Sequence, residues 1–113
     1  MKEIKAIIRP FKLLEVCEAL KEIEGLPGVT VSEIKGFGKS RAAGAKDKVV
    51  YEMVEFIPRL QLEVVLDDTM VDTVVDVIQK YAHTGNTGDG KIFVVNVEET
   101  IKIRTNERGP DAI

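Results

Sequence analysis

The 113-residue sequence contains one cysteine and one histidine, and this shortage excludes several kinds of site. The lone Cys17 cannot form a disulfide within the chain, and with His83 it provides no cluster of the kind that holds zinc. No nucleophilic side chain has a recognisable base beside it, so catalysis has little support. We therefore predict a protein that is not an enzyme, with no catalytic and no metal-binding residues.

The sequence also lacks long apolar runs and an excess of positive charge. No segment is long and apolar enough to span a bilayer, and residues 1–5 lack the apolar core of a secretory signal. The net charge of −3 argues against a general nucleic-acid-binding protein. We expect a cytoplasmic protein that neither inserts into membranes nor binds nucleic acid.

What is present is the composition of one ordinary globular domain, with 44% hydrophobic and 31% charged residues. Small and charged residues at 39–48 predict a long exposed loop, which in a small domain is usually functional. Apolar residues at helical spacing predict one helix at 11–23 and another that follows the capping residues 67–69 and ends near 82. β-Favouring runs predict strands at 3–8, 29–38, 49–57, 59–66 and 91–97, with Pro58 separating the third from the fourth, and a final short strand at 100–104.

The order of these predicted elements is β-α-β, long loop, β-α-β, which is the split βαβ plan. We therefore predict an α+β, ferredoxin-like double βαβ fold in a single domain, residues 1–113, with two helices on one face of an antiparallel sheet. The other face of that sheet has no predicted helix to cover it. A second copy of the chain is the usual cover, so a closed homo-oligomer is expected.

The most distinctive motif is the loop at residues 84–91, Thr-Gly-Asn-Thr-Gly-Asp-Gly-Lys, which leads into an apolar strand. Its three glycines permit positive φ angles and close approach of the backbone to a ligand. Successive N–H groups in such a turn can form a nest for an anion, and Lys91 would add a positive charge for phosphate oxygens. The same residues also fit a helix C-cap and a tight turn. The loop matches neither the Walker A nor the dinucleotide-binding pattern.

Basic residues elsewhere favour the anion-binding interpretation. Lys102 and Arg104 are two residues apart, so in a strand their side chains would point the same way. Lys39 follows Gly-Phe-Gly at 36–38, where the glycines permit close approach of a ligand. Each of these charges alone is typical of a solvated surface, whereas together with Lys91 they resemble a polyphosphate clamp.

Several short motifs occur in order along nearly the whole chain: Ala-Ile-Ile-Arg-Pro-Phe-Lys at 6–12, Gly-Phe-Gly at 36–38, Phe-Ile-Pro-Arg at 56–59, the glycine-rich stretch within 84–94, and Ile-Arg-Thr at 103–105. In these motifs and their spacing, the chain resembles the PII signal-transduction proteins. The resemblance implies a ferredoxin-like homotrimer that binds ATP or ADP, with AMP as a further candidate, in clefts between subunits. It also implies a T-loop at about 39–55 that acts on a target protein, a B-loop at 83–91 with its signature within 84–94, and a C-terminal loop at about 102–113.

The resemblance also assigns roles to individual residues. In the family, the B-loop of one subunit meets the C-terminal loop of its neighbour around the nucleotide. The phosphate-binding roles fall on Gly88, Asp89, Gly90 and Lys91 with Lys39, Lys102 and Arg104, and the adenine side falls on Thr30, Gly36, Phe37, Gly38 and Val65.

The T-loop departs from the family pattern at two positions. Ser40 stands where many members have a glutamine that helps to hold magnesium and 2-oxoglutarate, so binding of both stays open. Glu52 stands where a modified tyrosine falls, which leaves the adjacent Tyr51 as the candidate for modification.

Three alternative functions remain: a sensor of adenine nucleotide plus bicarbonate or another small anion, a slow ATPase, and a structural trimer without a ligand. The resemblance places the target, a transporter or an enzyme, in nitrogen or related metabolism.

Overall fold

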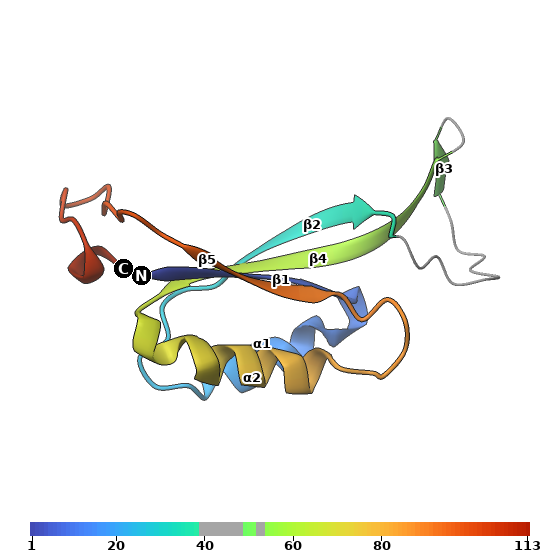
Figure 1. Ribbon diagram of the computed structural model, residues 1–113, viewed down its shortest axis with the longest axis horizontal. Coiled ribbons are helices and arrows are strands. Elements are labelled where there is room, and N and C mark those ends of the chain that lie inside the picture. The colour runs from blue at the N-terminus through green and yellow to red at the C-terminus, as the bar shows by residue number, and fades with distance from the viewer. Residues whose placement is uncertain (39–48, 52–53) are drawn as a thin grey trace.

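The computed structural model describes residues 1–38, 49–51 and 54–113, and it consists of an antiparallel sheet with two helices on one face (Figure 1). The long axis of both helices runs roughly along the strands. The elements are β1 (Lys2–Ile8), α1 (Leu13–Lys21), β2 (Thr30–Gly36), β3 (Val49–Tyr51), β4 (Val54–Leu66), α2 (Val71–Ala82) and β5 (Lys91–Asn96), with short 3-10 turns at Pro10–Lys12, Asp68–Met70 and Pro110–Ala112.

The strands follow the order β2-β4-β1-β5 across the sheet, and every pair is antiparallel. β1 lies in the interior, with Ile4 opposite Val64 of β4 on one side and opposite Val94 of β5 on the other. β3 pairs with the first residues of β4 and extends the sheet beyond this frame. The predicted ferredoxin-like double βαβ fold is confirmed.

The core forms between the sheet and the helices because one side of each element is apolar. In β1, Ile4, Ala6 and Ile8 are buried, and the residues between them are not, as expected for a strand with one covered face. Val74 and Ile78 lie four positions apart on α2, so they share the helix face that packs on the sheet, and both are buried. The apolar period of β1 and of α2 therefore predicts which side of each element packs into the core.

One predicted strand boundary is wrong, because Pro58 does not separate two strands. β4 runs through Pro58 without interruption, from Val54 to Leu66. Pro58 pairs with Lys35 of β2 on one side, whereas β1 reaches only as far as Leu60 on the other side. A proline is tolerated where one side of a strand has no neighbour to receive an N–H group.

The predicted strand at 100–104 is also wrong. Ile101 forms an isolated bridge with Arg108, and the residues that follow Ile101 form a turn. The turn is closed by the N–H of Asn106, which donates to the carbonyl of Lys102 at 2.8 Å. Asn106 has a φ of 62°, which lies in the left-handed region and ends any extended run. The two side chains of Lys102 and Arg104 therefore do not point the same way by virtue of lying two positions apart in a strand.

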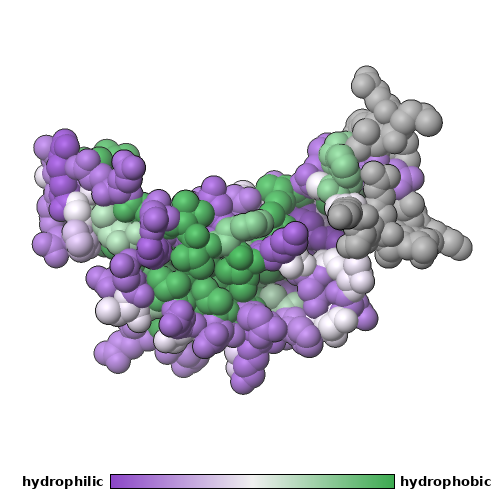
Figure 2. Space-filling view, in the orientation of Figure 1, coloured by the Kyte–Doolittle hydropathy of each residue, from purple (hydrophilic) through white to green (hydrophobic). Residues whose placement is uncertain are grey.

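The face of the sheet opposite the helices is uncovered in the single chain. Phe93 and Val95 of β5 lie on this face and are each 46% exposed. A further group of apolar side chains lies at the β5 edge of the sheet, over the middle of the molecule where β5 and α2 lie in Figure 1, as Figure 2 shows. Apolar surface of this extent is typical of an association site, and the homotrimer stays a prediction. Among the described residues, no helix combines the length and the apolar character that crossing a membrane requires.

Candidate functional site

The structure places the predicted site residues at two opposite ends of the sheet. We name these the loop end, which holds residues 36–38 and 84–91, and the pocket end, which holds Thr30, Val65 and residues 102–104 (Figure 1). β5 joins the two ends, and its six residues span about 20 Å at the usual rise of a strand. A single chain therefore does not bring the predicted phosphate-binding residues together, nor the predicted adenine-side residues.

At the loop end, two glycines set the path of the backbone between α2 and β5. Gly88 and Gly90 have φ angles of 101° and 99°, which residues with a side chain rarely adopt. A Cβ on Gly90 would lie 1.7 Å from the carbonyl oxygen of Ile7, so the loop enters β5 in direct contact with the backbone of β1. A Cβ on Gly88 would lie 3.3 and 3.2 Å from guanidinium nitrogens of Arg9 and Arg59. Gly90 thus permits an approach to the backbone of β1 that a side chain would prevent, whereas at Gly88 the ends of the two arginine side chains would have to shift by only a few tenths of an ångström.

Asp89 ties this loop together through its carboxylate. Oδ2 accepts hydrogen bonds from the backbone N–H groups of Thr84 at 2.8 Å and of Gly85 at 2.9 Å. Oδ1 accepts from the Thr84 hydroxyl and, as an ion pair, from Arg9 Nε at 3.0 Å. The bonds from the Thr84 hydroxyl and N–H, with weaker contributions from Arg9 and Gly85, hold the pKa of Asp89 well below its ordinary value. The carboxylate is therefore ionised and engaged inside the loop.

The same loop leaves backbone donors available for a ligand. The N–H groups of Thr87, Gly88 and Asp89 make no hydrogen bond with any part of the chain that the structure describes. Successive donors next to a glycine of positive φ form the kind of concave site that binds phosphate or another anion. Lys91 follows as an exposed side chain at the start of β5. The predicted phosphate-binding residues 88–91 therefore lie together.

Two arginines that sequence reasoning missed lie against the loop. Arg9 follows β1 and donates from Nη2 to the carbonyl of Thr87 at 2.8 Å. Arg59 of β4 lies beside Gly88 and donates to the carbonyl of Pro58 at 2.9 Å. Burial first, and then the charge of Arg9, lower the pKa of Arg59. No carboxylate in the described part of the chain pairs with Arg59, so the loop end concentrates positive charge.

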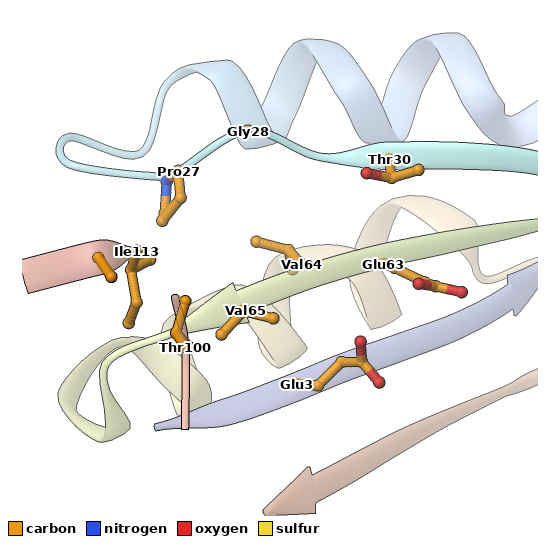
Figure 3. Close-up of a pocket in the computed structure, with 10 residues that line it drawn as sticks. Glu3, Pro27, Gly28, Thr30, Glu63, Val64, Val65, Thr100 and Ile113 are labelled. Atoms are coloured by element: carbon orange, nitrogen blue, oxygen red, sulfur yellow. The ribbon is translucent and has the colours of Figure 1, made fainter. Parts of the chain in front are cut away.

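At the pocket end lies a cavity of about 300 Å³. Thr30 and Val65, both predicted to lie on the adenine side of the site, contribute to its wall together with the carboxylates of Glu3 and Glu63. Figure 3 shows Thr30 and Glu63 on neighbouring strands at one side of the cavity and Ile113 at the other. Its volume is at the low end of the range for small-ligand sites. Sequence reasoning missed the two glutamates because strand alternation marks them only as residues of the polar face.

The basic residues of the pocket end belong to a tight turn. The N–H of Lys102 donates to the carbonyl of Glu107 at 2.9 Å, and Lys102 Nζ lies 3.9 Å from Oε1 of Glu107. Ile103 is 99% exposed, and Arg104 is exposed beside it. Lys102 and Arg104 therefore present their charges at the far end of β5 from Lys91.

The remaining predicted residues lie at or beyond the end of β2. Phe37 packs edge-on against Phe56 of β4, with ring centroids 5.7 Å apart, and so joins the two strands where they leave the sheet. Gly36 and Gly38 flank Phe37 at the loop end. Four further residues lie outside the described part of the chain, either entirely or in their side chains: Lys39, Ser40, Glu52 and Tyr51.

Comparisons with known proteins agree with the resemblance seen in the motifs. A family model described as nitrogen regulatory protein P-II matches residues 1–107. The chain is 50% identical to nitrogen regulatory protein P-II of Azospirillum brasilense, 52% to that of Rhizobium meliloti (strain 1021) and 49% to nitrogen regulatory protein P-II 1 of Escherichia coli (strain K12). Each alignment spans 113 residues, which is 100% of both chains. The chain therefore belongs to the nitrogen regulatory protein P-II family.

Proposed function

We propose that the protein is a P-II-type signal-transduction protein that binds ATP and ADP in clefts between the subunits of a homotrimer. It regulates a target protein through its T-loop, at about 39–55. The names of the relatives support nitrogen or related metabolism as the setting, with a transporter or an enzyme as the target. The observation that carries the proposal is the loop at 84–91, where three neighbouring N–H groups have no partner in the described chain and Lys91 follows them.

A nucleoside polyphosphate fits the chemistry of the loop end. The N–H groups of residues 87–89 supply neutral donors, and Lys91 supplies a compact charge. Arg59 adds a guanidinium with no carboxylate partner among the described residues. Hydrogen bonds from charged donors to phosphate are roughly twice as strong as neutral ones. AMP has a single phosphate and would use fewer of these contacts, so we expect it to bind more weakly than ATP and ADP.

A nucleoside fits the chemistry of the pocket end. The carboxylates of Glu3 and Glu63 can accept hydrogen bonds from ribose hydroxyls, and Thr30 offers a hydroxyl of its own. Val65 offers apolar contact for the base. The two carboxylates would repel phosphate groups, which directs the phosphates away from this cavity and towards the basic residues.

Two subunits are needed because the two halves of this chemistry lie at opposite ends of one sheet. If the loop end of one subunit faces the pocket end of the next, Lys91 shares a cleft with Lys102 and Arg104 of its neighbour. The uncovered sheet face, with Phe93 and Val95, supports association into a closed ring. The assembly would thus complete the site as well as cover the sheet.

Calorimetric titration with ATP, ADP and AMP tests the nucleotide, and light scattering tests the assembly. We expect a particle of three times the 12.5 kDa chain mass, with ATP and ADP bound more tightly than AMP. Failure to bind any of the three nucleotides at millimolar concentration would reject the proposal. A monomeric particle that binds ATP would reject the intersubunit cleft alone.

Mixed trimers test whether the cleft is shared. We would refold chains carrying Lys91→Ala together with chains carrying Arg104→Ala, neither of which should bind ATP well by itself. In a shared cleft, a mixed trimer regains one site with both residues intact, so ATP binding should return on mixing. If both residues served a site within one chain, mixing would restore nothing.

A second candidate adds a small anion as a second effector, because Arg9 and Arg59 lie together at the loop end. Both guanidiniums lie within 3.3 Å of the position of a Cβ on Gly88. Asp89 is the one carboxylate among the described residues that pairs with either arginine, and it pairs with Arg9. An additional anion would balance this charge. Ser40 in place of the family's glutamine favours bicarbonate or another small anion over Mg-dependent binding of 2-oxoglutarate.

Titration of bicarbonate and of 2-oxoglutarate into the Mg-ATP complex separates these effectors. We expect bicarbonate to bind and Arg59→Gln to weaken it. Micromolar binding of 2-oxoglutarate would contradict the small-anion variant, and binding unaffected by Arg59→Gln would place the anion elsewhere.

We propose regulation in the cytoplasm rather than catalysis, since the relatives are named as regulatory proteins. A slow ATPase is the competing function at the same site. Sustained hydrolysis of ATP above about 1 s⁻¹, the low end for ordinary enzymes, would favour the competing function.

A further inference from the structure

The resemblance assigns Asp89 to phosphate binding, yet its carboxylate is already fully engaged inside the loop. A carboxylate offers about four lone-pair sites. Four donors use them: the N–H and hydroxyl of Thr84, the N–H of Gly85 and Nε of Arg9. The side chain therefore retains no acceptor for a metal or a sugar hydroxyl, and its negative charge would repel a phosphate.

Arg9 holds the loop at two points. Its Nε donates to Asp89 at 3.0 Å, and its Nη2 donates to the carbonyl of Thr87 at 2.8 Å. The Arg9 and Asp89 side chains are only 20% and 23% exposed, so solvent screens this pair less than an ordinary surface ion pair. Because Arg9 directly follows Ile8, the last residue of β1, the pair fastens the loop to the interior of the sheet.

These contacts divide the loop into an occupied part and an available part. The carboxylate of Asp89 takes up the N–H groups of Thr84 and Gly85, and the N–H of Asn86 donates to the Thr84 hydroxyl at 3.1 Å. The next three N–H groups, those of residues 87–89, have no partner in the described chain. The division falls at the residue that Arg9 holds through its carbonyl, Thr87.

We propose that Arg9 and Asp89 are a pair of positioning residues for the anion site. Asp89 shapes the loop through its side chain and contacts the anion only through its N–H group. Arg9 holds the loop on β1 and compensates the negative charge of Asp89. The identity of the anion rests on the proposed function, whereas the shaping of the loop does not. Loss of either side chain should therefore loosen the loop even without a ligand.

The first measurement is amide hydrogen exchange at Thr84 and Gly85, with no nucleotide present. In Asp89→Asn, one carboxylate oxygen becomes an NH₂ group that cannot accept a hydrogen bond. We expect both amides to exchange at least about tenfold faster, as in a local opening, while the amides of β1 keep their protection. Arg9→Lys keeps the charge but cannot make both contacts at once, so we expect a smaller increase in the same direction.

The second measurement is the affinity for ATP. We expect about a tenfold loss in Asp89→Asn and a loss in Arg9→Lys, with the double variant losing less than the product of the two, because both changes break one contact. Lys12→Gln is the matched control. It removes a positive charge three residues away, from a lysine that pairs with Glu15 at 3.5 Å, and we expect neither measurement to change.

Unchanged exchange at Thr84 and Gly85 in Asp89→Asn would overturn the positioning role, whatever happens to ATP. Faster exchange together with wild-type affinity would also overturn it, since the loop would then matter to the fold and not to the site. If the wild-type protein binds no ATP, the nucleotide proposal fails by itself and the exchange result decides the shaping of the loop. If Asp89→Asn does not fold, Arg9→Lys decides by the same two measurements.

Discussion

The loop end and the pocket end of the sheet differ in how far a single chain completes them. At the loop end, Asp89 accepts four hydrogen bonds and Arg9 fastens the loop to β1. At the pocket end, the turn presents Ile103 with 99% of its surface exposed, and the ion pair of Lys102 with Glu107 spans 3.9 Å. The hydrogen bonds of the Asp89 carboxylate hold the loop at 84–91 in place within one chain, whereas the turn at 102–104 leaves Ile103 and Arg104 exposed. One chain thus carries a loop that its own contacts fix and an exposed turn, which we call the receiving surface because a neighbouring subunit would contact it in the proposed trimer.

The largest expected effect comes from adding a side chain at Gly90, where the loop at 84–91 meets β1. In Gly90→Ala, the new Cβ would lie 1.7 Å from the carbonyl oxygen of Ile7, at a residue with a φ of 99°. Because the backbone itself must move, we expect the free energy of unfolding to fall by about 3 kcal/mol or more. Chemical denaturation measures it.

Gly25→Ala is the matched control for that substitution. Gly25 also has a positive φ, 78°, but a Cβ there would meet nothing within 4 Å. The loss should be about 1 kcal/mol, from the backbone conformation alone. Equal losses in the two variants would contradict the close contact between the loop and β1.

The next effect is on ligand binding rather than folding. Lys91→Ala should weaken ATP binding by on the order of 1.5–3 kcal/mol, as for the loss of a charge-assisted hydrogen bond. Lys21→Ala removes the same charge from the exposed last turn of α1 and should leave the affinity unchanged. Calorimetry measures both, and equal affinities for the two variants would remove Lys91 from the site.

The pH dependence of the free energy of unfolding, compared between the wild type and Asp89→Asn, tests whether the Asp89 carboxylate stabilises the loop. The pKa of Asp89 is lowered in the folded protein, so its carboxylate stabilises the fold fully above the ordinary value of about 3.9. That stabilisation is lost progressively as the pH falls below this value towards the lowered pKa. Between pH 5 and pH 2, the free energy of unfolding should therefore decrease less in Asp89→Asn than in the wild type. Parallel curves would contradict the engaged carboxylate.

The smallest effect on the fold is expected at the pocket end. Because Ile103 is 99% exposed, Ile103→Ser should change the stability of the single chain by less than about 0.5 kcal/mol. If this turn receives a partner, the variant should nevertheless dissociate at higher protein concentration than the wild type. Leu14→Ser, at a 69% exposed residue of α1, is the control and should leave the assembly intact. Sedimentation at several concentrations would reject the receiving surface if both variants assemble like the wild type.

Local patterns predicted most of the helices and strands and part of the site. The alternation in β1 and the helical spacing of Val74 and Ile78 predicted which sides are buried, because those periods follow from backbone geometry. The capping side chain of Asp67 does accept a hydrogen bond, from the N–H of Thr69 at 3.0 Å. Glycine density predicted the positive φ angles of the loop at 84–91, because positive φ is a property of single residues.

Patterns failed where contacts between residues that are not adjacent in the chain decide the outcome. Pro58 reads as a break, but it is accommodated because β1 has already ended beside it. The spacing of Lys102 and Arg104 predicted a strand, but both residues lie on a turn. Hydrogen bonds and an isolated bridge within residues 100–109 close this turn. No sequence spacing relates Arg9 to Asp89, which are 80 positions apart.

The sequence by itself therefore determined the order of the helices and of most strands, their apolar faces and a glycine-rich loop with positive φ angles, since each depends on residues close together in the chain. Only the tertiary structure decided that Arg9 and Arg59 meet at Gly88 and that Asp89 is engaged internally. It also decided that Lys91 lies at the opposite end of β5 from Lys102 and Arg104. The physical reason is the register of the sheet, which sets side by side residues that the chain keeps far apart.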